Sequence, residues 1–177
     1  MKALKKIILV VLLIPIALVI VSLFLPSKYR VERRVTMNAK PGAVFPRINT
    51  LKQWPEWTAW TVAKYPDMKV SFSGPEAGVG AGYNWAGQSS GRGALKITRS
   101  DPDKGIGYDL DFEGGKYVSK GDITLEPSGE AVSVIWSNEG DLGWNPVSRF
   151  FGLFMDKMMG PDFEEGLRNL QKKVEAK

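Results

Sequence analysis

The longest hydrophobic stretch of the chain is residues 7–25, which contains no charged side chain. A helix of this length spans roughly 28 Å, close to the hydrocarbon thickness of a bilayer. Lys2, Lys5 and Lys6 precede the stretch. Pro15 lies within it, and helices in lipid tolerate proline better than helices in water do. We therefore predict a tail and transmembrane anchor in residues 1–26 and a folded domain in residues 27–177.

Two alternatives to a retained anchor stay open. A basic start followed by an apolar core is also typical of a cleaved secretory signal, although this core is longer than usual and lacks a small-x-small ending. An all-round apolar helix can also be buried in a soluble protein. Basic residues lie on both sides of the stretch, but a short basic tail normally stays in the cytoplasm. The pattern thus favours a single-pass membrane protein with an exported domain.

After the stretch, hydrophobic and polar residues alternate in a series of short segments separated by glycine-rich turns. This period of two predicts β-strands, at residues 29–37, 69–73, 82–86, 91–100, 105–113, 117–126 and 131–139. Pro41 and the tryptophans Trp54 and Trp57 mark two short helices between the first two strands. Apolar residues then recur at spacings of three and four from 146 to 159, with a break expected at Gly160 and Pro161 before the pattern continues to the end. The order of elements predicts an α+β fold in which the last helix covers one face of an antiparallel sheet.

Strand alternation also predicts which side chains face that helix. The inward strand positions that we single out are Tyr83, Trp85, Leu95, Ile97, Tyr108, Leu110, Phe112 and Trp136. Their expected partners on the helix are Phe150, Phe151, Phe154, Met155 and Met158. Packed solidly, this set is an ordinary core; with the two surfaces apart, its aromatic and methionine side chains would line a cavity for an apolar ligand.

Composition limits the chemistry that this domain can perform. The chain has no cysteine and no histidine, which excludes disulfides, thiolate nucleophiles, imidazole bases and zinc-finger ligands. Three of the 24 basic residues and none of the 19 acidic ones precede residue 27, so the remainder carries a net charge of only +2. We expect neither a metal nor a cofactor, and no nucleic-acid partner. Asp109, Asp111 and Glu113 share one strand face, but it is the face expected to point to water.

Several sequence segments resemble the SRPBCC superfamily, whose START-like helix-grip fold includes polyketide cyclase/dehydrase-like and lipid-transfer domains. They are residues 29–37, 39–45, 54–60, 74–80, 108–112 and 139–143, and the resemblance extends over about residues 29–175. It is strongest to the membrane-anchored bacterial members. The resemblance implies a seven-stranded antiparallel sheet curled around a long C-terminal helix with an apolar cavity between them. It implies no catalytic residue, because the superfamily holds binders, carriers and enzymes on one scaffold.

Three functions remain open from the sequence. The first is a membrane-tethered domain that binds an apolar small molecule or lipid at the cavity residues named above, without catalysis. The second is a cyclase/dehydrase-like enzyme that uses Tyr83, Tyr108 or an inward carboxylate such as Glu56 or Asp67 for proton transfer. The third is a scaffold with a solid core that engages a membrane protein. The space between sheet and helix distinguishes them.

Overall fold

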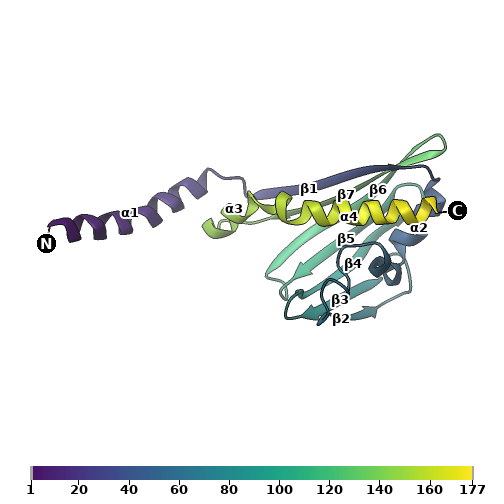
Figure 1. The fold of residues 1–177 in the computed structure, drawn as a ribbon, viewed down its shortest axis with the longest axis horizontal. Helices are drawn as coiled ribbons and strands as arrows, with labels where there is room; N and C mark the ends of the chain where they lie inside the picture. Colours follow the sequence, from purple (N-terminus) through teal and green to yellow (C-terminus); the bar gives the residue numbers. More distant parts are fainter. Residues whose placement is uncertain (1, 177) are drawn as a thin grey trace.

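A computed structural model describes the backbone of residues 2–176 and the side chains of residues 13–176. It contains four α-helices, one 3-10 helix and seven strands in the described residues (Figure 1). In chain order these are α1 (Lys2–Leu23), β1 (Lys28–Met37), α2 (Pro41–Asn49), η1 (Leu51–Glu56), β2 (Lys69–Ser73), β3 (Gly82–Gly87), β4 (Gly91–Asp101), β5 (Gly105–Phe112), β6 (Tyr117–Ser128), β7 (Ala131–Asp141), α3 (Pro146–Gly152) and α4 (Met155–Glu175). The predicted α+β class and all seven predicted strands are confirmed.

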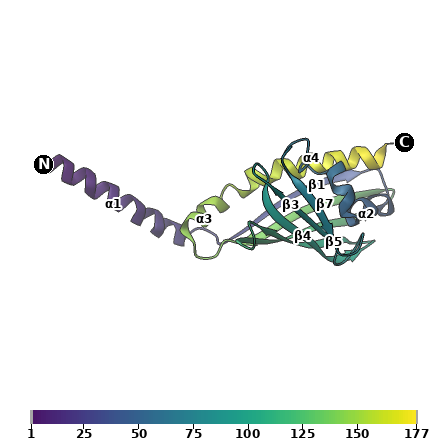
Figure 2. The same cartoon turned by 90° about the horizontal axis from the view of Figure 1, so that it is seen from below.

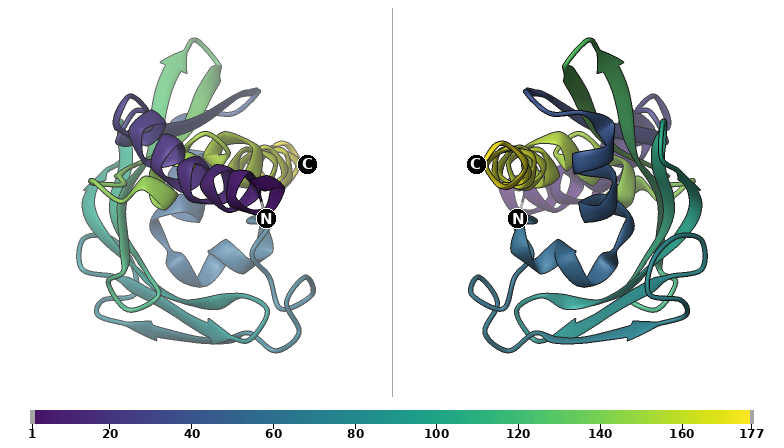
Figure 3. Two further views of the ribbon diagram at one scale, coloured as in Figure 1. Left: turned by 90° about the vertical axis from the view of Figure 1, so that its left-hand side faces the viewer. Right: turned by 90° about the vertical axis from the view of Figure 1, so that its right-hand side faces the viewer.

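The seven strands form one antiparallel sheet in the order β1-β7-β6-β5-β4-β3-β2. Strand β1 is the only one placed out of chain order, because it crosses to pair with β7 over its whole length. Viewed end-on, the sheet curves around α4 and the η1 region (Figure 3). This is the helix-grip arrangement that the sequence resemblance implies.

The face of α4 that packs on the sheet consists of Gly160, Phe163, Gly166, Leu167 and Leu170, all of them buried. Phe163 stacks on Trp136 of β7, with ring centroids 4.3 Å apart and planes inclined by only 2°. Gly166 allows this close approach, since a Cβ there would lie 2.8 Å from the Trp136 ring. Helix and sheet are therefore in direct aromatic contact at the middle of the domain.

The indoles of η1 fill the remaining space beside α4. Trp54 Nε1 donates to the Ile48 carbonyl at 2.8 Å, and Trp57 Nε1 donates to the Arg47 carbonyl at 3.2 Å. The Trp57 ring lies 5.2 Å from that of Trp136. These bonds satisfy both buried indole N–H groups, so that Trp54 and Trp57 attach the short helices to the sheet.

The predicted position of the helix break is wrong. The chain leaves the helical path at Leu153 and Phe154, between α3 and α4, and α4 runs through Gly160 and Pro161. Arg33 of β1 explains this continuity, because its guanidinium donates to Asp156 at 2.7 Å and to Glu164 at 2.6 Å, on either side of the proline. Gly160 leaves room for this guanidinium, since a Cβ there would lie 2.0 Å from Arg33 Nη2 and the arginine would have to shift. Tertiary contacts thus hold α4 together where local propensity predicts a break.

Helix α1 projects away from the sheet as a separate rod (Figures 1 and 2). The predicted anchor, residues 7–25, falls partly on residues 7–12, whose side chains lie outside the described part of the chain. Within the described part, no helix combines the length and the apolar character needed to cross a membrane.

Candidate functional site

The inner face of the sheet becomes progressively more exposed toward one end. On β5, Ile106 and Tyr108 are buried, whereas Leu110 and Phe112 at the same register are half-buried. On β3, Tyr83 is buried and Trp85 is half-buried. The gradient has the same direction on neighbouring strands, so one end of the inner face is accessible and the other is closed.

Strand register places the exposed positions beside one another. Trp85 pairs with Gly93, Gly93 with Phe112, and Phe112 with Tyr117, which forms one continuous row across four strands. The indole of Trp85 covers Gly93, where a Cβ would lie 2.3 Å from the ring, and its centroid is 6.1 Å from that of Phe112. Tyr117 completes the row and is 47% exposed.

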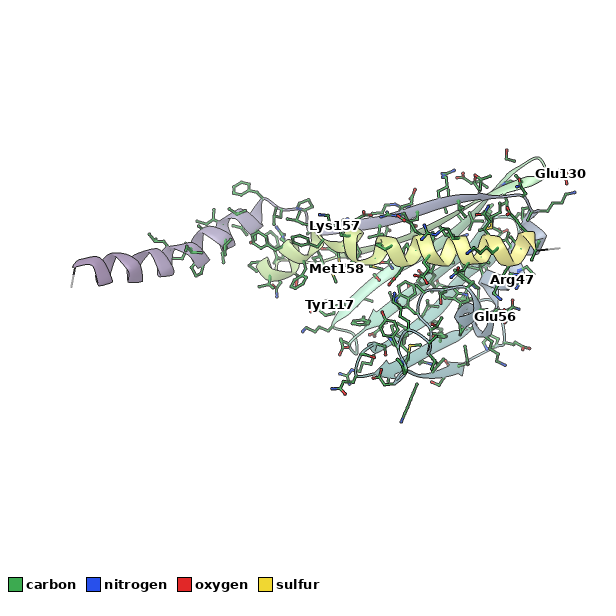
Figure 4. All side chains as sticks on the ribbon, in the orientation of Figure 1. Arg47, Glu56, Tyr117, Glu130, Lys157 and Met158 are labelled. Atoms are coloured by element: carbon green, nitrogen blue, oxygen red, sulfur yellow. The ribbon has the colours of Figure 1, made fainter. Side chains whose placement is uncertain are left out.

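Helix α4 contributes Met155 and Met159 to the same end, both half-buried against the core. Figure 4 shows the start of α4, at Met158, and Tyr117 on the side of the domain that α1 approaches. We call this region the open end and define it by Trp85, Leu110, Phe112, Tyr117, Met155 and Met159. Its side chains are flat rings and flexible thioethers, which adapt well to apolar ligands.

A short polar chain lies on the sheet beside the open end. The Tyr29 hydroxyl donates to Asn138 Oδ1 at 3.1 Å, and Asn138 Nδ2 donates to Ser119 Oγ at 3.1 Å. Ser119 pairs directly with Leu110 of the open end. Burial raises the pKa of Tyr29, which keeps the phenol protonated and able to donate. Asn138 and Ser119 are themselves buried, so of the three groups only the half-buried Tyr29 reaches the lining of a neighbouring hollow.

The opposite half of the inner face has no room for a ligand. Trp57, Trp136, Phe163 and Leu167 are each at most 2% exposed. A space large enough for a water molecule would expose part of these side chains, so the surfaces of sheet and helix interdigitate here. The expected cavity between the middle of the sheet and the last helix is therefore replaced by a solid aromatic core.

This arrangement divides the twelve candidate residues into four groups. Five belong to the solid core: Tyr83, Leu95, Ile97, Tyr108 and Trp136. Trp85, Leu110, Phe112 and Met155 line the open end, and Phe150 is half-buried in α3. Phe154 and Met158 are 51% and 59% exposed. The expectation that these two and Phe151 face the sheet is wrong: all three are more than half exposed, and the helical residues that pack on the sheet lie further along α4.

Some members of the site were not singled out from the sequence. Tyr117 and Ser119 share the inward register of β6, and Met159 lies four residues after Met155, so alternation and helical spacing could have identified them. Alternation also places Tyr29 in the register of Val31, and Asn138 in that of Trp136, but it does not bring the two together. Their role depends on the pairing of the first strand with the last, which a single sequence does not reveal.

Neither Glu56 nor Asp67, the carboxylates named for proton transfer, is buried on the inner surface; both are exposed. Glu56 pairs with Lys173 at 3.1 Å, and Asp67 accepts hydrogen bonds from Ser89 and from the Gln88 backbone N–H. Hydrogen bonding from Ser89 lowers the pKa of Asp67, opposite to what a general acid requires. Burial raises the pKa of both Tyr83 and Tyr108. The described residues also contain no cluster of acidic side chains able to hold a metal ion.

Two surface hollows accompany these features. A hollow of about 130 Å³ beside the open end is lined by residues that include Tyr29, Arg149 and Met155. Another of about 260 Å³ lies between β2 and η1 and includes Leu51, Phe72 and Glu76. Typical small-molecule sites begin at about 300 Å³. The first hollow shares Met155 with the open end, whereas the second shares none of the residues that define it.

Comparison with known proteins agrees with this architecture. Residues 28–175 match the model of a family described as polyketide cyclase / dehydrase and lipid transport. No curated protein matches the sequence.

Solved structures of this shape include three with low sequence identity. Norcoclaurine synthase from Thalictrum flavum, in complex with dopamine and hydroxybenzaldehyde, is 16% identical, with a TM-score of 0.58 over 85% of this chain and 88% of that chain. A hypothetical protein from Helicobacter pylori is 7% identical, with a TM-score of 0.62 over 82% and 87%. A protein from Chromobacterium violaceum is 17% identical, with a TM-score of 0.54 over 85% and 99%. At these identities the similarity concerns the fold alone.

Proposed function

Because the chain belongs to the polyketide cyclase/dehydrase and lipid transport family, we propose that it binds an apolar small molecule or lipid at the open end. The observation that carries this proposal is the row of half-exposed apolar side chains on an otherwise buried sheet face. Covering that row would remove apolar surface from water, which is favourable by about 25 cal/mol per Å². The half-buried Tyr29, held in place by its hydrogen bond to the buried Asn138, would orient a polar group of the ligand.

We further propose that residues 7–25 tether the domain to a membrane. The large apolar side chains of α1 support this part of the proposal, since Leu13, Ile14, Ile16 and Ile20 are each more than half exposed. The linker between α1 and β1 is short, so the open end would remain near the bilayer. A tether of this kind favours ligands that partition into lipid. With the basic tail in the cytoplasm, the domain would be exported.

Binding is favoured over acid–base catalysis by the ionisable groups near the site. The phenols of Tyr29, Tyr83 and Tyr108 all have raised pKa values, so they are poor bases near neutral pH. The carboxylates considered from the sequence, Glu56 and Asp67, serve other contacts. A carrier or binding role needs none of these groups to ionise.

Two adjacent residues of β6 provide a matched test of the binding site. Tyr117 faces inward at the open end, whereas Val118 faces outward and is 62% exposed. We expect Tyr117→Asp to weaken binding of a fluorescent fatty acid by the purified chain at least tenfold, because a charge there must be desolvated by the ligand. Val118→Asp should leave binding unchanged.

The outcome depends on the difference between the two variants. Equal affinity of both variants and the wild type would place the ligand away from the open end. Failure of the wild type to bind the fatty acid would contradict the proposed function. Mass spectrometry of lipid extracted from the purified chain, with the same two variants, would identify the natural ligand class.

A further inference from the structure

An exposed apolar surface lies outside the sheet, on the segment that joins β7 to α4. Residues 142–155 contain a single charged side chain, Arg149. Around it, Val147, Phe151, Phe154 and Met158 recur at spacings of four and three and are 63%, 56%, 51% and 59% exposed. Trp144 is 81% exposed. We call these five residues the α3 patch.

The single charge of this segment does not interrupt the patch, because Arg149 is turned inward and only 7% exposed. Its Nη1 donates to the carbonyls of Ser22, Leu23 and Leu25 at 3.2, 3.3 and 3.3 Å, and its Nε donates to Gly143 at 2.8 Å. Ser22 and Leu23 belong to the last turn of α1, where carbonyls lack helical i+4 partners, and Leu25 lies in the linker that follows. Arg149 therefore fixes α3 against the end of α1.

The local fold keeps the patch in place. Asn145 caps α3 by accepting from the backbone N–H groups of Val147 and Ser148 at 2.9 and 3.2 Å. The Leu142 N–H donates to the Ser27 carbonyl at 2.7 Å, which joins the loop before α3 to the linker after α1. Figures 1 and 2 show α3 beside the point where α1 ends, and these contacts hold the patch there.

From this geometry we infer that the α3 patch is a second membrane contact, which lies in the interfacial layer of the bilayer beside the exit of α1. The inference rests on the proposed tether. We infer lipid as the partner because the Arg149 contacts hold the patch beside the apolar helix α1. Where α1 enters a bilayer, the patch would therefore meet the same lipid. Tryptophan and phenylalanine suit the interface, where such segments insert by roughly 5–10 Å. The exposed Asp156 and Lys157, next to Met158, mark the charged edge of the patch.

Insertion of the patch would also set the orientation of the domain. The open end shares Met155 and the hollow at Tyr29 and Arg149 with the α3 segment. A bilayer in contact with α1 and α3 together would therefore lie beside the open end, and an apolar ligand could pass from lipid to protein over a short distance.

The absence of cysteine from the sequence allows a direct test with single labelled sites. The full chain is reconstituted in vesicles of phosphatidylcholine and phosphatidylglycerol, with an environment-sensitive fluorophore on Phe151→Cys or, separately, Phe154→Cys. Leu18→Cys on α1 reports the tether. Val79→Cys, which is 60% exposed in the loop before β3, is the matched control far from α1. Lipids that carry a nitroxide near the headgroup or near the acyl chain end serve as quenchers.

Each pattern of quenching has one interpretation. We expect the Phe151→Cys and Phe154→Cys labels to be quenched several-fold more than the Val79→Cys label, and more by the shallow nitroxide than by the deep one. The Leu18→Cys label should be quenched mainly by the deep nitroxide. If that label is quenched and the two patch labels match Val79→Cys, the patch inference fails and the tether stands. If the Leu18→Cys label is not quenched, the tether fails. Patch labels with blue-shifted emission but no quenching would show that protein covers the patch, which also overturns the inference.

Discussion

Helices α3 and α4 carry apolar side chains at the same helical spacing, but they bury them to opposite degrees. In α4 the stripe of Phe163, Leu167 and Leu170 is at most 2% exposed, because it packs on the sheet and the indoles. In α3 the stripe of Val147 and Phe151 is more than half exposed. An apolar stripe on a helix therefore does not by itself show whether the stripe packs against the protein core or remains on the surface.

The largest difference between the two helices should appear in stability. Phe163→Ala removes the ring that stacks on Trp136 and leaves a cavity in the solid core, so we expect it to lower the free energy of unfolding by about 3–5 kcal/mol. Phe151→Ala changes an exposed ring and should cost less than about 0.5 kcal/mol. Urea unfolding of the full chain, followed by circular dichroism, measures both. Similar losses in the two variants would contradict the division into a buried and an exposed stripe.

A smaller effect is expected where α3 meets α1. Arg149→Ala removes the donor to the Ser22, Leu23 and Leu25 carbonyls and should destabilise this junction by about 1–3 kcal/mol. Amide hydrogen exchange should become faster at residues 22–25 and 146–152, with little change in α4. Arg149→Lys keeps the charge and one donor, so it should restore part of the protection. Unchanged exchange in Arg149→Ala would show that the junction does not depend on this side chain.

The smallest effect concerns the clamp on α4 and its dependence on pH. Hydrogen bonds from Arg33 lower the pKa of Asp156 below its ordinary value of 3.8. A carboxyl group with a lowered pKa in the folded state stabilises the fold above its unfolded pKa, and this contribution is lost as the pH falls through the folded value. The free energy of unfolding of Arg33→Met should therefore fall less steeply with decreasing pH than that of the wild type below about pH 4.

The control for this pH experiment is Arg47→Met, because Arg47 has no carboxylate within salt-bridge distance among the described residues. The acid unfolding profile of this variant should have the slope of the wild type. A wild-type slope in Arg33→Met would show that the Arg33 clamp contributes nothing to the acid sensitivity.

The sheet could be predicted from the sequence because most strands alternate apolar and polar residues and glycine lies in many of the turns between them. The site could be predicted only in part. Alternation correctly placed Trp85, Leu110 and Phe112 on the inner face, but it could not separate half-buried positions from the buried Ile97 and Tyr108. That difference depends on how far α4 and the indoles extend over the curved sheet.

The break expected at Gly160 and Pro161 is absent for a related reason. Gly160 and Pro161 are locally unfavourable in a helix, but contacts from Arg33 to Asp156 and Glu164 stabilise α4 across them. Those contacts join residues more than a hundred positions apart, and no local pattern contains them. The same holds for Tyr29 and Asn138, which meet only because β1 pairs with β7.

The central claim, that an apolar ligand binds at the open end, is tested most directly by photoaffinity labelling. The full chain in lipid vesicles is irradiated with a diazirine-bearing fatty acid, and the labelled residues are identified by peptide mass spectrometry. We predict labels on Phe112, Tyr117, Met155 and Met159 that an excess of unlabelled fatty acid removes. Competed labels confined to the hollow at Phe72, or labels on α1 alone, would contradict the assignment of the open end as the ligand site.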